Sequence, residues 1–507
     1  MTSILTRSTV VALMKETTEG TPVPPGASTD YVAIQDDFKM TPSFDVLTNA
    51  ELKSSIGKSQ PILGAEHPSA SFSHYLRSSG VAGQAPNYGK LLESLCGAVA
   101  VAATERSTTT GSTVTVIKVP SGQGADFQRG QVLLLKDGVN GYRIRALESV
   151  SGDDMTPMFA LPTGMAPASG VALGKAVLYK PANSGHPTLT VWQYIGNSGA
   201  TQMMAGGRVT SGSFDVSTGD LINASYTIDG VSFYFDPINI LAADTKLDFT
   251  DDDGTFTATI AAKMYKDPYE LAAALTTAMA GANPNQTPSV TYDSKTGKFT
   301  IKTTGTLLSL LWNTGSNASN TVGDKIGFST AADNTGTGAT TGYTGGSAIS
   351  FVAPQTASFD AANPLAAKDN EVMIGDTTDY LCFNASSVKM DWTNTRAEIK
   401  SVCAQSGISG SIISEREVKF SITAILDKYD ADKWNRFKNG SNTKFQYSFG
   451  SKSGGNWIAG FCGCLASPTA VIDSFEVADQ DGLAVLNLEL TAYVDAAGDG
   501  EAYINTL

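Results

Sequence analysis

Apolar and polar residues alternate along most of the chain with the two-residue period of a β-strand. The clearest runs are Val114–Val119, Val388–Trp392, Val418–Ala424 and Leu483–Val494. Asp-Gly turn signals separate such runs at Asp137-Gly138, Asp229-Gly230, Asp253-Gly254 and Asp481-Gly482. The pattern therefore predicts a mainly β protein built from hairpins.

Three segments have the period of a helix instead. They are Asn87–Val99, Asp267–Ala280 and Asp430–Asn439. The second begins Asp267-Pro-Tyr-Glu270, which supplies an N-cap, a proline in the first turn and a capping-box glutamate. We expect one helix to flank the β core and the Asp267 helix to belong to a separate unit.

Two stretches differ from the rest and predict inserted domains. Residues 108–180 have the turn-rich pattern of a small all-β domain, and residues 226–350 combine strands with the Asp267 helix, as in an α+β lobe. The lobe ends in a tract rich in Gly, Thr, Ser and Asn, Thr314–Ser347, which we interpret as a mobile loop or linker. Residues 1–107, 181–225 and 351–507 would then form one core.

Pairs of a short and a longer strand recur in that core. The pairs are Gly207–Phe214 with Leu221–Ile228, Ser386–Trp392 with Glu417–Leu426, and Val471–Phe475 with Leu483–Val494. We interpret them as hairpins that contribute to one sandwich or barrel.

The charge of the chain restricts its partners. With 507 residues, 41% hydrophobic and 17% charged, the chain can bury several cores, and its formal net charge is −14. A sequence-reading DNA-binding protein needs a basic surface against phosphates, so this class is disfavoured. A protein that lets DNA slide past without binding remains compatible.

Candidate catalytic and metal chemistry is sparse. The five cysteines do not suggest a disulfide framework, and the three histidines do not combine with them at metal-ligand spacing. Cys462 and Cys464 lie two apart in a strand pattern, which predicts two buried small side chains. Gly57-Lys-Ser59 lacks the glycine that a phosphate-binding loop requires at position 52, and Asp251-Asp-Asp-Gly254 fits a hairpin turn better than a calcium loop. We expect no enzymatic activity, metal or cofactor.

No apolar run reaches the length of a membrane helix, and no secretory signal pattern is evident near the N-terminus. We therefore expect synthesis in the cytosol and no membrane partner.

Several segments together resemble a known family. Met14-Lys-Glu-Thr-Thr-Glu-Gly-Thr21 resembles the E-x-x-x-G-T opening of bacteriophage tail tube proteins, the major tail proteins of phages with long non-contractile tails. Further similar segments follow in the family's order: Ser71–Arg77, Ala85-Pro86, Leu91–Gly97, Thr188–Trp192, Met204–Ser213, Ser386–Trp392, Gly407–Ser411 and Glu415–Phe420. The resemblance spans Met14 to about Val494 and excludes the two inserted domains.

The resemblance implies a β-sandwich or barrel core of tail-tube type with one flanking helix. It implies a virion structural protein, assembled in the host cytoplasm, whose homohexameric rings stack into a hollow tail tube that conducts DNA during genome ejection. The implied partners are other copies of the chain, the tape measure protein, the tail terminator and tail tip proteins, while DNA passes through the lumen without specific binding.

Two sets of residues follow from this analogy. Candidate lumen-facing carboxylates are Asp36, Asp37, Asp45, Glu415 and Glu417, because an acidic wall repels DNA. The candidate ring-stacking loop contains Val46, Asn49, Glu51, Lys53, Lys58 and Gln60. Both sets could equally be ordinary solvated positions.

Other structural roles remain open. The inner tube of a contractile tail would share the fold, and the second inserted domain also suits a decoration, fibre or flagellin-like subunit. A secreted hydrolase or carbohydrate-binding module is a third class, in which Trp and Tyr side chains would line a sugar site.

Overall fold

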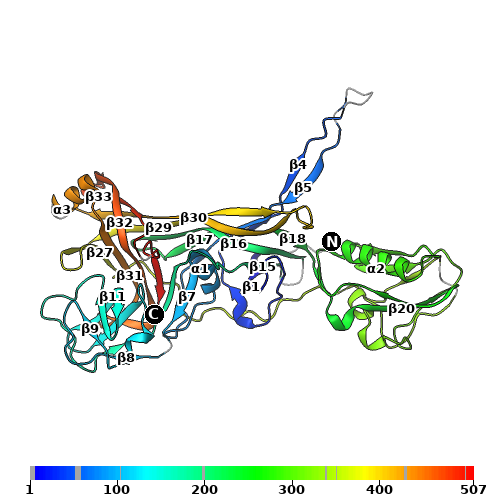
Figure 1. Cartoon of the computed structure of the whole chain (residues 1–507), viewed down its shortest axis with the longest axis horizontal. Helices are drawn as coiled ribbons and strands as arrows, with labels where there is room; N and C mark the ends of the chain where they lie inside the picture. The colour runs from blue at the N-terminus through cyan, green and yellow to red at the C-terminus, as the bar shows by residue number, and fades with distance from the viewer. Residues whose placement is uncertain are drawn as a thin grey trace.

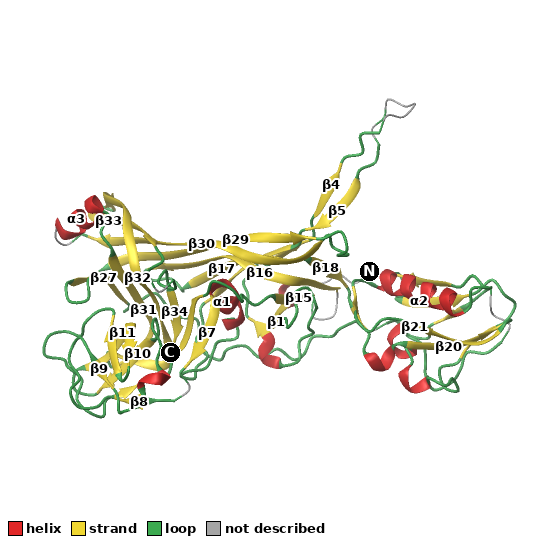
Figure 2. Ribbon diagram, in the orientation of Figure 1, coloured by secondary structure: helices red, strands yellow, loops and turns green. Residues whose placement is uncertain are grey.

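The computed structural model describes residues 6–51, 57, 59–102, 104–196, 200–336, 340–349, 351–426, 431–496 and 498–507. The molecule is elongated: a β-sandwich body lies between a small β domain at one end and an α+β lobe at the other, and one hairpin projects from the body (Figure 1). Strands dominate the chain (Figure 2), so the prediction of a mainly β fold with few helices is confirmed.

The body consists of two copies of one arrangement of strands, which we call module 1 and module 2. Module 1 contains β1 (Val10–Lys15), β2 (Tyr31–Val32), β3 (Lys39–Thr41), β4 (Phe44–Leu47), β5 (Ile62–Glu66), β6 (Ser69–Tyr75), α1 (Gly89–Cys96), β15 (Leu189–Ile195), β16 (Ala200–Ser217) and β17 (Asn223–Asp229). Module 2 contains β27 (Glu371–Gly375), β28 (Tyr380–Phe383), β29 (Ala385–Lys400), β30 (Ile408–Ile425), α3 (Ala431–Asn439), β31 (Thr443–Ser453), β32 (Asn456–Gln480) and β33 (Leu483–Ala492).

The repeat extends to the irregularities of the strand pairs. The β15–β16 register shifts between Leu189 and Val191, and the β31–β32 register shifts at the equivalent place, between Thr443 and Phe445. A second bulge falls at Thr210 where β16 pairs with β17, and at Asp473 where β32 pairs with β33. Bulges are specific devices that bend a strand, so matching bulges identify matching modules.

Each module is a sandwich of two four-stranded sheets. One sheet has the order β3-β6-β17-β16 in module 1 and β29-β30-β33-β32 in module 2. The other has the order β2-β1-β15-β16 and β28-β27-β31-β32. The long strands β16 and β32 pass through both sheets of their modules, beginning in the second and ending in the first.

The two modules form one body because β16 of module 1 pairs with β29 of module 2. This joint produces a continuous eight-stranded sheet, β3-β6-β17-β16-β29-β30-β33-β32, which we call the long sheet. Its inner face packs on one apolar cluster with side chains from both modules, including Phe214, Tyr226, Trp392 and Phe420. The expected sandwich core is therefore present, and the recurring strand pairs of the sequence belong to it.

The small β domain lies between α1 and β15 of module 1. It contains β8 (Arg106–Ser107), β9 (Ile117–Lys118), β10 (Val132–Asp137), β11 (Gly141–Ser151), β12 (Asp154–Pro157) and β13 (Ala172–Leu173). The flanking strands β7 (Gly97–Val101) and β14 (Val177–Pro181) pair with each other, and β14 pairs with β34 (Tyr503–Thr506) of the body. The expected range 108–180 thus includes most of β14, which is part of the body, because β14 continues a sheet of module 2.

The lobe connects the two modules rather than interrupting one. It contains β19 (Ile238–Asn239), β20 (Lys246–Asp251), β21 (Gly254–Thr259), β22 (Met264–Tyr265), α2 (Pro268–Ala282), β23 (Ser289–Asp293), β24 (Lys298–Lys302), β25 (Leu308–Leu310) and β26 (Tyr343–Thr344). The expected boundary at 226 falls inside β17, and β18 (Ser232–Phe235) also pairs with β16. The lobe therefore starts after Phe235.

Two local predictions in the lobe have different outcomes. Glu270 N donates a hydrogen bond to Asp267 Oδ1 (2.7 Å), so the predicted N-cap of α2 is confirmed. The prediction of a mobile tract at Thr314–Ser347 is wrong for much of its length. Val322, Ile326 and Phe328 are buried in the lobe core, and these few apolar side chains anchor a segment of otherwise polar composition.

Candidate functional site

The outer face of the long sheet is a continuous polar surface, which we call the polar face. Strand alternation sends Ser71 and Ser73 of β6, Ser225 and Thr227 of β17, and Ser211 and Ser213 of β16 to this side, because their neighbours point into the core. Across the module joint, Asp391 and Thr393 of β29 face Ser213 and Ser211. These residues line an open hollow together with Asp37 and Lys39.

Two lysines of the polar face, Lys389 and Lys419, are held by carboxylates of their own strands. Lys389 Nζ lies 2.8 Å from Asp391 Oδ2, and Lys419 Nζ lies 2.8 Å from Glu417 Oε1. Glu417, with Asp473 and Glu489, raises the pKa of Lys419. Carboxylates outnumber lysines here, so the middle of the face presents hydroxyls and net negative charge.

The candidate lumen carboxylates separate into three places. Glu415 and Glu417 are exposed on β30 and belong to the polar face. Asp36 and Asp37 are exposed in the turn before β3 rather than in a strand, and Asp37 Oδ1 accepts a hydrogen bond from Ser73 N (3.0 Å) at the border of the face. Asp45 is away from the face, on the projecting hairpin, where its Oδ1 lies 3.3 Å from His67 Nε2.

Further charged residues of the polar face were not among the candidate lumen carboxylates, although the strand pattern of the sequence indicates them. Asp215, Lys389, Asp391, Lys419 and Glu489 also lie on the polar face. They alternate with buried residues in strands that the pattern predicted, but only the pairing of β16 with β29 shows that the two halves form one surface.

The candidate stacking loop belongs to the projecting hairpin of β4 and β5 (Figure 1). Val46 lies in β4 and is 63% exposed, while Asn49 Oδ1 accepts a hydrogen bond from Glu51 N in the following turn. Gln60 is exposed at the start of the returning chain, and Lys53 and Lys58 lie outside the described residues.

This hairpin exposes apolar side chains on both of its faces. Val46 faces Leu63 (63% exposed), and Leu47 (54%) faces Ile62 (59%) in the adjacent pair. Because successive residues of a strand point to opposite faces, the two pairs lie on opposite sides. Exposed apolar surface marks an interaction site, so this two-stranded ribbon has one such site on each of its two sides.

The base of the hairpin is fixed to the body and to the lobe. His67 Nδ1 lies 3.0 Å from Glu398 Oε1 of β29, and Glu66 N donates to Ser406 O in the β29–β30 turn. Glu66 Oε2 also pairs with Lys266 Nζ of the lobe at 2.6 Å. These contacts fix the direction in which the hairpin leaves the body.

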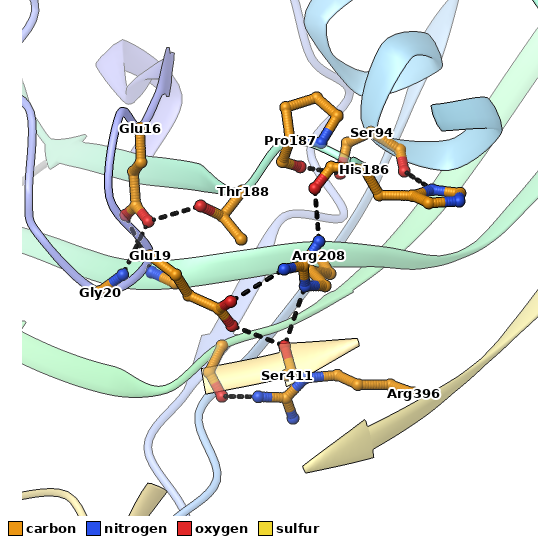
Figure 3. Close-up of polar contacts among 12 residues, drawn as sticks. Glu16, Glu19, Gly20, Ser94, His186, Pro187, Thr188, Arg208, Arg396 and Ser411 are labelled. Atoms are coloured by element: carbon orange, nitrogen blue, oxygen red, sulfur yellow. Dashed lines mark hydrogen bonds and ion pairs between the residues drawn. The ribbon is translucent and has the colours of Figure 1, made fainter. Parts of the chain in front are cut away.

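The motifs that carried the family resemblance meet in a buried polar cluster (Figure 3). The Glu16 carboxylate accepts four hydrogen bonds, from Gly20 N, Thr188 Oγ1, Thr190 Oγ1 and Gly206 N, at 2.8–2.9 Å. Burial raises the pKa of Glu16, and the four donors oppose that shift. The cluster closes the turn at Gly20 and joins β1 to β15 and β16.

A second carboxylate of that cluster joins the two modules. Glu19 Oε2 lies 2.8 Å from Arg208 Nη2 of β16, and Glu19 Oε1 accepts from Ser411 Oγ of β30 at 2.7 Å (Figure 3). Arg208 also donates to Ser411 Oγ and to the carbonyl of His186. The E-x-x-x-G-T segment is therefore a structural joint of the body.

Side chains suited to metal binding do not gather in the part of the chain that the structure describes, where no three of His, Cys, Asp and Glu form such a group. Cys462 and Cys464 are buried free thiols, as their spacing predicted. Within the same residues, no helix has the length and apolarity needed to cross a membrane.

Comparisons with known proteins include partial matches to solved structures of phage-like particles. No protein-family model matches the chain, and no curated protein matches it. The structure of a virion of the native gene transfer agent particle contains a chain with 16% identity and a TM-score of 0.19, over 24% of this chain and 90% of that one. A tail of the empty gene transfer agent particle gives 17% identity and a TM-score of 0.20, over 25% and 92%. At these TM-scores the matches do not assign a function.

Proposed function

We propose that this chain is a virion structural protein of a phage-like tail, whose copies close into rings that stack into a hollow tube for DNA. The observation that carries the proposal is the long sheet. Its inner face is a core and its outer face is polar, so the outer face can border water and a passing polyanion. The sequence resemblance to tail tube proteins points the same way, and its hexameric rings remain an expectation.

The polar face suits a channel wall for an electrostatic reason. Basic surfaces hold DNA by releasing counterions, so a wall that DNA must pass quickly should lack free cations. Here Lys389 and Lys419 are held by Asp391 and Glu417, and exposed Glu415 adds negative charge. Serine and threonine hydroxyls cover much of the remaining face.

The projecting hairpin supplies the contact along the tube. Its two apolar faces require cover from two surfaces, and a second copy in an adjacent ring would bury them. The inner tube of a contractile tail would use the same two surfaces, so the proposal covers both tail types. The chain would act without an enzymatic activity or a cofactor.

Negative-stain electron microscopy of the purified chain tests the proposal. We expect rings or stacked tubes with a central channel, and the variant Val46→Ser/Leu63→Ser should shift tubes toward short stacks. A protein that stays monomeric or trimeric without a channel at all concentrations, and that is absent from tails in lysates, would exclude a tube role and favour a fibre or decoration.

A further inference from the structure

The long sheet has two open edges, formed by β3 and β32. The equivalent strands of the other module pair with each other inside the chain. β3 pairs with β6 only, and β32 beyond Ala470 pairs with β33 only, among the pairings of the described residues. In the middle of the sheet, β16 and β29 are the equivalents of these strands, and they pair with each other. An unpaired strand edge is a template for another strand.

We infer that β32 of one copy pairs with β3 of the next in the register of β16 with β29, so that the repeating unit of the ring is the half-chain and three chains close it. This inference rests on the proposed tube function. It names the lateral partner of the long sheet, a second copy of this chain, and it replaces six chains per ring with three.

The register follows from the bulges and from the neighbouring strands. Phe214 lies four residues beyond the bulge of β16, and Val477 lies four residues beyond the bulge of β32. Met40 faces Ala70 in β6, as Met390 faces Phe420 in β30. Because Phe214 faces Met390 across the internal joint, Val477 of one copy would face Met40 of the next.

The exposure of Val477 is the sign of a missing neighbour. Phe214 is 1% exposed at the internal joint, whereas Val477 is 51% exposed at the equivalent position. Both positions point to the core side of the sheet, so Val477 is an apolar core residue at an uncovered edge. A neighbouring β3 would cover it with Met40.

The flanking helix does not obstruct this edge. In module 1, Leu95 of α1 packs against Gly212 of β16, and β29 nevertheless pairs beside it. In module 2, Trp434 of α3 packs against Phe475, which is the equivalent of Gly212. The helix thus covers the inner face of the long strand in both modules and leaves the outer edge available.

Charge also favours the joint. Glu476 is exposed on the polar side of β32, and the copied register places it opposite Thr41 and diagonal to Lys39 of the next copy. At the internal joint, opposite charges also meet across the two strands, because Lys389 lies directly opposite Asp215. Opposite charges at such cross-strand positions attract.

The size of the resulting barrel agrees with a channel for DNA. Each chain contributes the eight strands of the long sheet, so three chains give 24. With strands about 4.8 Å apart and tilted by about 40°, a barrel of 24 strands has a diameter of roughly 48 Å between backbones. The open diameter between facing side chains is roughly 38 Å. A DNA duplex, with grooves about 8 Å deep, is roughly 20 Å across. On the same geometry two chains would leave roughly 22 Å and six chains roughly 85 Å.

Cysteine crosslinking tests the joint and the count together. Thr41→Cys with Glu476→Cys, in a Cys382→Ser/Cys403→Ser background, should form disulfides between copies, because directly opposed cross-strand residues fall within disulfide reach. Oxidised rings should run as a covalent ladder that ends at three chains. The matched control is Thr41→Cys with Gln480→Cys, on the same face but about 13 Å further along the strand, which should not crosslink.

Native mass measurement of single rings supplies the second readout. Three chains of 52.9 kDa give about 159 kDa, and six give about 317 kDa. Rings of three that crosslink only through the matched pair support the inference. Rings of any other number, or rings of three that crosslink only through the control pair, overturn it while leaving the tube function in place, whereas a wild-type chain that forms no ring overturns both.

Discussion

Lys39 and Lys389 hold equivalent places in the two modules: each lies directly opposite a serine of the next strand, Ser71 and Ser421 respectively. Each is followed by a methionine that points into the core. In β29 the lysine is held by Asp391, while in β3 the equivalent position is Thr41, so Lys39 lacks that same-strand carboxylate. The equivalent strands β3 and β29 thus share one register, but their exposed side chains differ, and β3 lies at the open edge of the long sheet.

The first prediction concerns the buried carboxylate of Glu16. Glu16→Gln should lower the free energy of unfolding by about 3 kcal/mol, because an amide nitrogen would face two donors where the carboxylate accepts hydrogen bonds of about 1.5 kcal/mol or more each. Urea denaturation followed by circular dichroism measures the change. Glu415→Gln, at an exposed position, is the control and should stay within about 0.5 kcal/mol; equal stability of the two variants would contradict the role of Glu16.

The second prediction concerns acid stability. His74 is buried against the rings of Tyr88 and Tyr226, and burial lowers its pKa to about 4. Below pH 6.5 the unfolded chain binds a proton at His74 that the folded chain does not, so stability should fall by about 3 kcal/mol as the pH drops from 6.5 to 4. Above pH 6.5 this residue should contribute no pH dependence.

Denaturation midpoints at a series of pH values measure this effect. The lowered pKa of His186, also caused by burial, adds a loss in the same direction. His74→Phe should therefore flatten the profile between pH 6.5 and 4 without removing it entirely. A variant with the same slope as the wild type would show that His74 does not carry the effect.

The third prediction concerns the two faces of the hairpin. Val46→Ser/Leu63→Ser and Leu47→Ser/Ile62→Ser each remove one apolar pair, and each should shorten tubes while leaving the thermal unfolding of the subunit nearly unchanged, since these side chains are exposed in the monomer. Tube length in electron micrographs is the measurement. Val139→Ser removes a 92% exposed side chain of the small β domain and is the control. Normal tubes from both double variants would make the hairpin an ordinary solvated ribbon.

The fourth prediction concerns the polar face. Glu417→Lys removes the partner of Lys419 and adds a cation, so assembled tubes should retain DNA at low salt and release it as salt rises, because phosphate contacts weaken with ionic strength. Asp379→Lys makes the same change of charge in the exposed β27–β28 turn and should not retain DNA. DNA retention on purified tubes is the readout, and equal behaviour of the two variants would place the polar face elsewhere than the channel.

The sequence predicted the strands better than their assembly. The alternation in Val388–Trp392, Val418–Ala424 and Leu483–Val494 is local information, and the structure has a strand at each. The equivalence of β3 with β29 was hidden, because Lys39-Met40 and Lys389-Met390 share only two adjacent residues in strands of very different length. What makes them equivalent is their pairing with β6 and β30, which depends on contacts between residues distant in sequence.

Site residues were predictable only where they lay on regular strands. Glu415 and Glu417 fall on the polar face because β30 pairs with β29 in one unbroken register from Glu415 to Thr423. Asp36, Asp37 and Asp45 were placed by their proximity to an expected strand, and the structure puts them in a turn and on a hairpin that leaves the body. Pro42 and Pro68 lie close to where that hairpin leaves the body, and neither can donate a hydrogen bond to a neighbouring strand. Their positions indicate an interruption of the sheet, but they do not predict the direction in which the hairpin projects.

Joining two modules in one polypeptide fixes their stoichiometry at one to one and their order around the long sheet. Within the described residues, the small β domain and the outward-bent hairpin belong to the first module, and the lobe lies in the link between the modules. A covalent pair can thus specialise one member for external contacts while both contribute equal strands to the inner wall. In a closed ring of such chains, the inner wall would repeat once per module, whereas the exterior would repeat once per chain. The surface that faces DNA would therefore have twice the rotational symmetry of the exterior.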